Sequence, residues 1–164
     1  MDGATLNRME ITIVKVRDVL ALKGSVIITV APLETIGALA RLLREKRIGA
    51  VIVSSDGRTI EGVISERDVA YGLAVHGAKL DAMLVSALMT KTVITCSSQD
   101  SIANVASTML SRNIRHLPVV EDTRVVGMVS IRDVLNFRLD DLQQEAAQLR
   151  MFMNQTDRAP QDRE

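Results

Sequence analysis

The strings GVISERDVAYGL (residues 62–73) and GMVSIRDVLNFRL (residues 127–139) decide the fold of this chain, because both follow one unusual pattern. Each begins with glycine, continues with two apolar residues and a serine, and reaches Arg-Asp-Val after one variable residue. The first string carries Ser65 and Asp68, and the second carries Ser130 and Asp133. Such a pattern, written twice in 164 residues, indicates an internal duplication.

The duplication extends well beyond the two strings. Residues 27–53 align with residues 93–120, so that Thr35 matches Ser101 at an offset of 66. Gly62 matches Gly127 at an offset of 65, which requires the loss of one residue between the preceding strand and this glycine, in the stretch that contains the loops SSDGRT and EDTR. Loops tolerate such deletions, whereas packed elements do not. The chain therefore contains two related halves.

Each half predicts the same order of elements, β-α-β-β-α. A short apolar segment is followed by an amphipathic helix, which Thr35 or Ser101 opens. Two β-branched runs joined by a short polar loop predict a pair of strands, and a final helix begins at Glu66 or Ile131. A helical lead-in of roughly two turns precedes each repeat. Because one half is too small to bury a good core, we expect an α/β (α+β) fold in which the two repeats pack sheet to sheet.

The composition excludes several functional classes. Aromatic residues make up 2% of the chain, too few for a platform on which bases stack, and 20 basic residues balance 20 acidic ones. We therefore expect no nucleic-acid partner and no membrane. Cys96, the one cysteine, and two histidines offer no metal-binding spacing. With no signal peptide or membrane-spanning run in the sequence, we expect a cytoplasmic protein.

The repeated string has two interpretations. Ser65 and Ser130 lie where a strand meets a helix N-terminus, at which free amides and a hydroxyl can hold an anion. Asp68 and Asp133 can each accept both hydroxyls of a ribose, and the arginine before each adds a positive fork suited to phosphate. The alternative is a capping box, in which the aspartate bonds back to the backbone at the serine. The string by itself does not decide between them.

The surrounding sequence resembles the cystathionine-β-synthase (CBS) domain family. The resemblance is carried by REKRIGAVIVSSDGRTIEGVISERDV, by LSRNIRHLPVVEDTRVVGMVSIRDV and by the lead-in ALMTKTVITCSSQDSI, and it covers roughly residues 14–140. Family members occur as tandem pairs, called Bateman modules, with pseudo-twofold symmetry. This resemblance implies a stand-alone pair of bacterial type whose two clefts bind AMP, ADP, ATP, S-adenosylmethionine or NAD(H).

The resemblance also implies which residues bind the nucleotide. Asp68 and Asp133 match the family's ribose-binding carboxylate, and Ser65 and Ser130 match its residue near the phosphate or ribose. The full set of implied nucleotide-binding residues is Thr29, Gly49, Ala50, Ser65, Arg67, Asp68, Thr95, Arg115, His116, Pro118, Ser130, Arg132 and Asp133.

Arg115 and His116 replace Gly49-Ala50 in the second repeat and could bring phosphate-binding charge into the space between the clefts. The alternatives are a partly buried, hydrogen-bonded histidine and an ordinary solvated basic face.

The boundaries that follow are residues 1–13 as an N-terminal extension, 14–76 and 77–140 as the repeats, 141–155 as a helical extension and 156–164 as a disordered tail. An apolar stripe on the last helix has heptad-like spacing. Its residues are Leu135, Leu139, Leu142, Ala146, Leu149 and Met153. The stripe could pack on the chain's own body or join two chains. Because pairs in this family commonly dimerise through their helices, the resemblance implies a homodimer.

Three functions compete at this point. The leading hypothesis is a regulatory module that senses an adenine nucleotide (AMP, ATP or NADH) and signals to a protein partner that the sequence does not name. The second is an enzyme, which we do not expect, because the sequence has no Walker loop, no G-x-G-x-x-G string and no metal cluster. The third is a dimeric scaffold with vestigial clefts.

Overall fold

The first repeat has the predicted order of elements. The structure, a computed structural model, describes residues 13–24 and 26–156. The elements of the first repeat are β1 (Thr29–Val30), α2 (Ile36–Lys46), β2 (Ala50–Val53), β3 (Gly62–Ser65) and α3 (Glu66–His76). The hydroxyl of Thr35 caps α2 by accepting a 3.2 Å hydrogen bond from the backbone amide of Ala38. The predicted start of this helix is confirmed.

The second repeat departs from the prediction at its first strand. Its elements are α5 (Ile102–Arg112), β4 (His116–Glu121), β5 (Arg124–Ser130) and α6 (Ile131–Thr156). The expected first strand is reduced to a bridge between Cys96 and Val119. The chain turns directly after Cys96, because the amide of Ser97 donates to the carboxylate of Asp100 at 2.8 Å. The β-α-β-β-α order is therefore complete in the first repeat and lacks a full first strand in the second.

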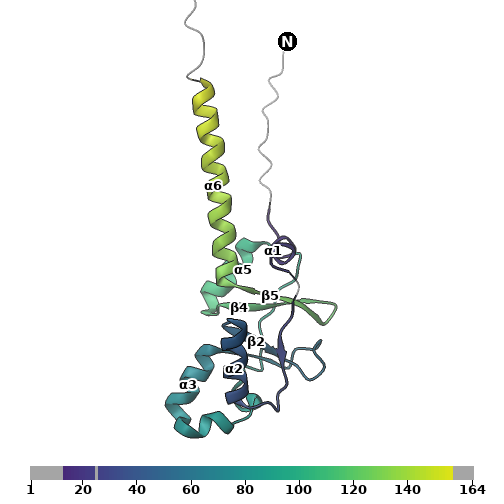
Figure 1. The fold of residues 1–164 in the computed structure, drawn as a ribbon. Helices are drawn as coiled ribbons and strands as arrows, with labels where there is room; N and C mark the ends of the chain where they lie inside the picture. The colour runs from purple at the N-terminus through teal and green to yellow at the C-terminus, as the bar shows by residue number, and fades with distance from the viewer. Residues whose placement is uncertain (1–12, 25, 157–164) are drawn as a thin grey trace, which may run out of the picture.

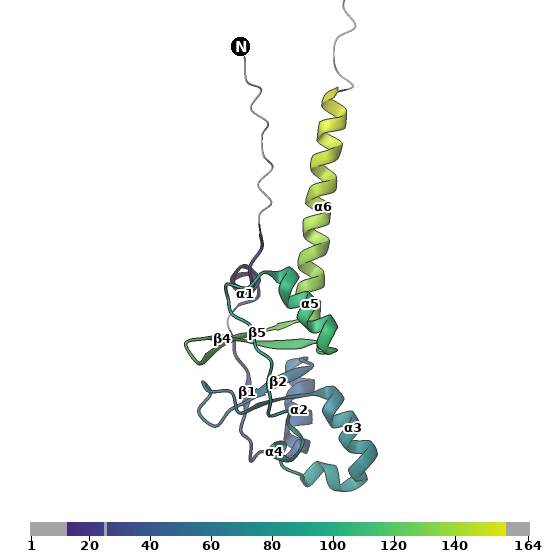
Figure 2. The same cartoon turned by 180° about the vertical axis from the view of Figure 1, so that it is seen from behind.

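The two sheets are small and lie one above the other. In the first, β1 pairs in parallel with β2, and β2 pairs antiparallel with β3. In the second, β4 pairs antiparallel with β5, with an irregularity between Val119 and Val120. Figures 1 and 2 show α1 and α5 above the upper sheet, and α3 and α4 below the lower one. The expected packing of two α/β repeats is confirmed.

The two lead-in segments are exchanged between the repeats. Helix α1 (Val16–Lys23) precedes the first repeat but docks on the second, where the amide of Val16 donates to the carbonyl of Asp100 at 2.9 Å. Helix α4 (Val85–Leu88), which follows the short helix η1 (Gly77–Ala82), docks on the first repeat, where Val85 donates to Glu34 at 2.8 Å. The predicted length of about two turns holds for α1, with 8 residues, and not for α4, with 4. Each repeat is thus completed by a segment that lies before the other in sequence.

The repeated glycines make room for these exchanged segments. A Cβ atom on Gly62 would lie 2.7 Å from Sδ of Met89, and one on Gly127 would lie 2.8 Å from Cδ2 of Leu20. Separations this short are steric clashes, so a residue with a side chain would push the lead-in away. The glycine of the repeated string therefore serves the packing of the two halves.

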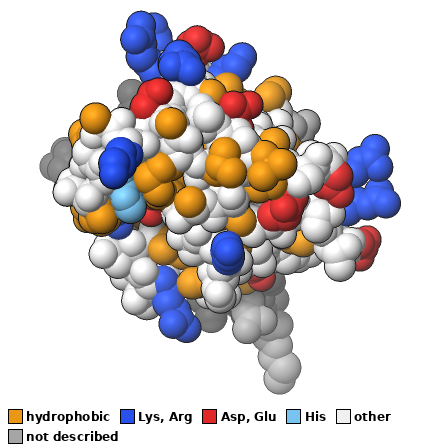
Figure 3. Space-filling view, turned by 90° about the horizontal axis from the view of Figure 1, so that it is seen from below, with side chains coloured by type: hydrophobic (Ala, Val, Ile, Leu, Met, Phe, Trp, Pro, Cys, Tyr) orange, Lys and Arg blue, Asp and Glu red, His pale blue; other side chains and the backbone are white. Residues whose placement is uncertain are grey.

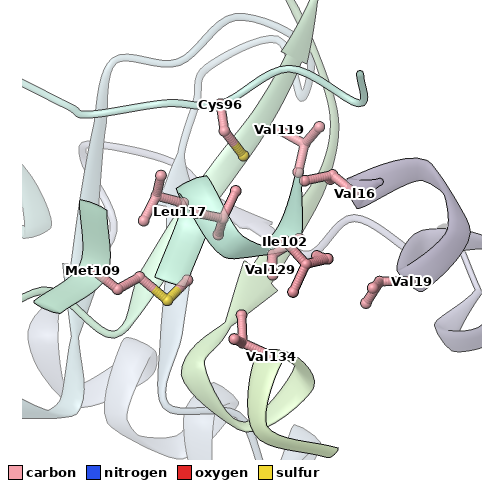
Figure 4. Close-up of a cluster of buried hydrophobic side chains, with 10 residues drawn as sticks. Val16, Val19, Cys96, Ile102, Met109, Leu117, Val119, Val129 and Val134 are labelled. Atoms are coloured by element: carbon pink, nitrogen blue, oxygen red, sulfur yellow. The ribbon is translucent and has the colours of Figure 1, made fainter. Parts of the chain in front are cut away.

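Each repeat has its own hydrophobic core. The core of the second repeat combines Val16 and Val19 of α1 with side chains of α5, β4, β5 and α6, among them Leu117 and Val129 (Figure 4). Cys96 also lies there, and burial together with the nearby charge of Asp100 raises the pKa of its thiol to about 12. The core of the first repeat is built in the same way and includes Leu80 and Val85 from the other lead-in.

The last helix is longer than the predicted extension. Helix α6 runs without interruption from Ile131 to Thr156, so residue 156, predicted to begin the disordered tail, is helical. Residues 157–164 lie outside the described part of the chain, as do residues 1–12 of the predicted N-terminal extension. Within residues 13–24 and 26–156, the structure contains no helix that combines the length and the apolar character needed to cross a bilayer.

Candidate functional site

Both repeated strings form capping boxes at a strand–helix junction. The carboxylate Oδ2 of Asp68 accepts hydrogen bonds from the backbone amide (2.7 Å) and the hydroxyl (2.6 Å) of Ser65. Oδ2 of Asp133 accepts the same two bonds from Ser130, at 2.7 and 2.8 Å. The capping interpretation is therefore correct at both positions. It does not exclude ligand binding, because all of these bonds go to one oxygen of each carboxylate and a carboxylate has two.

The larger cleft lies between the repeats and has a volume of about 740 Å³. The second repeat contributes the junction around Ser130 and Asp133. The first repeat contributes residues 26–28, ahead of β1, and residues 47–50, where α2 gives way to β2. This volume is within the range of about 300–1,000 Å³ that is usual for small-molecule sites.

The smaller cleft has a volume of about 250 Å³ and is built from the corresponding segments with the repeats exchanged. The first repeat contributes the junction around Ser65 and Asp68. The second repeat contributes residues 92–94 and residues 113–116. The two clefts are therefore equivalent in construction and unequal in size.

Most of the residues implied by the resemblance line these clefts. The larger cleft brings together Gly49, Ala50, Arg115, His116, Ser130, Arg132 and Asp133. The smaller cleft brings together Ala50, Ser65, Arg67, Asp68, Arg115, His116 and Pro118.

Thr29 and Thr95 line neither cleft. In extended chain, neighbouring side chains point in opposite directions. The preceding residues, Ile28 and Ile94, occupy the cleft walls in their place.

Asp133 carries an ion pair, whereas Asp68 forms none with a described residue. Nζ of Lys23, the last residue of α1, lies 2.7 Å from Oδ2 of Asp133 and also donates to the carbonyl of Met128 at 3.2 Å. Burial raises the pKa of Asp133, but the hydrogen bonds from Lys23 and Ser130 outweigh it, so that the pKa is lowered from its ordinary value of 3.8. Asp133 is therefore ionised at neutral pH, with a cation bound where a ligand hydroxyl would approach.

Replacing Lys23 with Met should remove a pH-dependent part of the stability. Because the pKa of Asp133 is lower in the folded chain than in the unfolded one, the ionised carboxylate stabilises the fold above about pH 4 and ceases to do so as the pH falls through the folded value. The side chain of Lys23 is 44% exposed, so we expect a loss of less than about 1 kcal/mol at pH 7 that becomes smaller as the pH falls through the folded pKa of Asp133. Urea denaturation at several pH values measures both.

Lys91→Met is the matched control, since Lys91 is exposed and has no ion pair with a described residue. A pH-dependent loss of equal size in this control would show that the effect does not come from the pairing of Lys23 with Asp133.

The arginines of the two strings, Arg67 and Arg132, differ in their hydrogen bonds. Nη1 of Arg67 donates to the carbonyl of Asn113 at 3.2 Å and so links α3 to the second repeat. Arg132, its equivalent, makes no hydrogen bond or ion pair with any described residue and lines the larger cleft. The guanidinium of Arg132 is therefore available to a ligand in the larger cleft.

The basic charge of the larger cleft is its main electrostatic feature. Five basic residues line it against two acidic ones; the basic residues are Lys23, Arg44, Arg47, Arg115 and Arg132, and the acidic ones are Glu66 and Asp133. The smaller cleft has Arg67 and Arg115 against Asp68. An anionic ligand is therefore favoured in the larger cleft.

His116 lies between the two clefts and lines both. Burial lowers its pKa, the charge of Arg115 lowers it further, and Glu66 acts in the opposite direction. The imidazole is therefore neutral at pH 7. The positive charge that the second repeat brings between the clefts therefore comes from Arg115. Its Nη2 lies 3.9 Å from Oε1 of Glu66.

Some lining residues were not identified from the sequence. Ile27 and Ile28 match Val93 and Ile94 in the repeat alignment, so the repeated apolar pair was a usable signal. Lys23 had no such signal, because its position depends on the docking of α1 on the opposite repeat.

The fold and its paired clefts define a tandem α/β module that can hold small molecules between its repeats. Residues 13–74 and 85–140 match the family of the CBS domain, and this chain belongs to that family. It carries two such domains in tandem, as the resemblance implied.

Similar proteins include both solved structures and curated sequences. The crystal structure of the CBS-domain containing protein ATU1752 from Agrobacterium tumefaciens has a TM-score of 0.74 and 35% identity, and covers 76% of this chain and 99% of that one. The CBS domain pair of protein MJ0100, in complex with 5′-methylthioadenosine and S-adenosyl-L-methionine, has a TM-score of 0.69 and 28% identity, and covers 79% of this chain and 98% of that one. The uncharacterized protein MK0525 of Methanopyrus kandleri is 30% identical over 110 residues, which are 66% of this chain and 56% of that protein. The chain thus spans a little over half of that relative's length.

Proposed function

We propose that this protein is a regulatory module that binds an adenosine-containing ligand, with the larger cleft as its principal site. The observation that carries the proposal is the presence, in one 740 Å³ cleft, of an ionised Asp133 and a surplus of basic side chains. A carboxylate recognises the paired hydroxyls of a ribose, and arginine recognises phosphate. The complex of MJ0100 with two adenosine derivatives supports the same ligand class.

Phosphate-bearing ligands such as AMP, ADP, ATP or NADH suit the larger cleft best. Arg132 has no hydrogen bond or ion pair with a described residue. The side chains of Arg44 and Arg47 likewise form no hydrogen bond or ion pair with a described residue. They can therefore turn to a phosphate without breaking a contact. The smaller cleft, at about 250 Å³ and with Arg67 already bonded to Asn113, suits a smaller or less charged ligand.

Ligand binding has a route to the rest of the molecule through Lys23. Oδ2 of Asp133 already accepts three hydrogen bonds, two from Ser130 and one from Lys23. A ribose that engages both oxygens displaces Lys23, the most exposed of these donors, and frees the last turn of α1. Helix α1 is part of the core of the second repeat. A ligand that binds more tightly to the conformation in which Lys23 is released from Asp133 increases the population of that conformation, and a partner protein can distinguish it from the ligand-free one.

The arrangement favours binding over catalysis. The hydroxyl of Ser130 donates to a carboxylate whose pKa is lowered, and so weak a base does not activate a nucleophile.

Isothermal titration of the full chain with ATP, AMP, NADH, S-adenosylmethionine and adenosine tests the proposal. We expect saturable binding of at least one phosphorylated ligand, with an affinity that falls more steeply with salt than that of adenosine, because phosphate contacts are screened. GTP, which has the same ribose and phosphates, is the control for base recognition. Absence of binding by every adenosine-containing ligand to folded protein would overturn the proposal.

A further inference from the structure

Helix α6 leaves the body of the protein after its first turns. Val134 is buried in the core of the second repeat, and Ile131 and Phe137 pack against that core. Beyond them, Figures 1 and 2 show α6 extending away from both repeats with no other helix or strand beside it. A helix of this kind is marginally stable by itself in water, because packing of an apolar face supplies most of the stability of helices in proteins.

Helix α6 carries an apolar stripe that begins beside the body and continues along the projecting part. Its members are Leu135, Leu139, Leu142, Ala146, Leu149 and Met153, at alternating spacings of four and three. The leucines and Met153 are each between 55% and 68% exposed. The alternative of a stripe packed on the chain's own body is therefore wrong for these side chains. The body is contacted by a different face of the same helix, the one with Val134 and Phe137.

We propose that α6 pairs side by side, in parallel, with α6 of a second copy of this chain. In heptad terms the d positions are Leu135, Leu142 and Leu149, and the a positions are Leu139, Ala146 and Met153. Leucine at d is a preference of parallel two-stranded coiled coils. The stripe is already exposed at Leu135, so a second helix can approach where α6 leaves the body.

The charges beside the stripe favour the parallel orientation. Glu145 is at a g position and Arg150 at the following e position, so in a parallel pair Glu145 of each copy faces Arg150 of the other. An antiparallel pair that keeps the same apolar layers brings the two Glu145 side chains together instead, and like charges repel. The stripe thus carries charge complementarity to a second copy of itself.

The end of the molecule formed by the first repeat also exposes apolar side chains, which lie across the middle of the face in Figure 3, with charged side chains mostly around its edge. On α6 the exposed apolar side chains recur at heptad spacing along one line. None of the stripe residues lines either cleft, so the pairing is independent of the proposed function.

Sedimentation equilibrium of the full chain tests the pairing. We expect a dimer, and we expect Leu142→Glu with Leu149→Glu to weaken its dissociation constant by about a hundredfold or more, since four leucines are lost from the interface. The matched control is Gln144→Glu with Met151→Glu, which adds the same charge at f positions and should leave the dimer intact. A monomeric wild-type chain, or a dimer that survives the leucine replacements, would overturn the proposal.

Disulfide cross-linking tests the orientation without weakening the helix. In a parallel pair Leu149→Cys lies opposite itself and should form a covalent dimer on oxidation, whereas in an antiparallel pair it lies beside position 139 of the other copy. The native Cys96 is buried, so it does not interfere. A cross-link that forms only when Leu139→Cys and Leu149→Cys chains are mixed would show an antiparallel pair and refute the parallel one.

Discussion

Replacing Asp133 with Asn should weaken the binding of an adenosine nucleotide by about tenfold to a hundredfold. The ribose hydroxyls lose a charged acceptor, and a hydrogen bond to a charged group contributes about 1.5–3 kcal/mol. The amide keeps the size of the side chain, so the shape of the cleft is retained. Titration calorimetry with the ligand that binds best to the wild-type chain measures the change.

Asp68→Asn is the matched control for this replacement. Asp68 caps its helix through the same two bonds from Ser65 that Asp133 receives from Ser130. Both variants therefore replace the capping carboxylate with a weaker, neutral acceptor, and Asp133→Asn in addition loses the ion pair with Lys23. If the principal site is the larger cleft, only the change at Asp133 should affect the tighter binding event. Equal losses in the two variants would assign the effect to the caps and not to ribose recognition.

Leu117→Ala should destabilise the fold by about 2–5 kcal/mol. The side chain of Leu117 is 1% exposed and lies in the core of the second repeat, together with Val16 of α1 and Val129 of β5. Its removal leaves a cavity that the surrounding side chains fill only in part. Urea denaturation followed by circular dichroism measures the loss, at one fixed protein concentration because dimer formation makes the apparent stability depend on concentration.

Leu110→Ala serves as the comparison within the same repeat. Leu110 is on α5 and is 76% exposed, so the same chemical change should cost less than about 0.5 kcal/mol. Similar losses at the two positions would contradict the assignment of Leu117 to a closely packed core.

The local features of the fold could be predicted because they repeat. The alignment of the halves placed the helix starts at Thr35 and Ser101, and the structure confirms both as caps. The string around Asp68 and Asp133 was interpreted as a cap or as a ligand site. The structure shows the cap at both positions and places both carboxylates in clefts, so the two interpretations are compatible.

The differences between the halves were not predictable from the alignment. The repeats match closely around Ser65 and Ser130, yet one cleft is about three times the volume of the other. The clefts also differ in contacts between distant segments, namely the ion pair of Lys23 with Asp133 and the bond of Arg67 to Asn113. Thr29 and Thr95 were expected at the clefts but line neither of them. In an extended segment, a shift of one residue reverses the direction in which a side chain points, so an expected position can be wrong by one residue.

The sequence by itself determined the duplication, the order of the elements in the first repeat and the chemistry of the strand–helix junctions, because these depend on spacings of a few residues. The tertiary structure alone decided that α1 completes the second repeat and α4 the first, that Lys23 binds Asp133, and that the leucines of α6 face away from the body. Periodicity indicates that a helix has an apolar face, but the packing of segments far apart in the chain decides what that face meets.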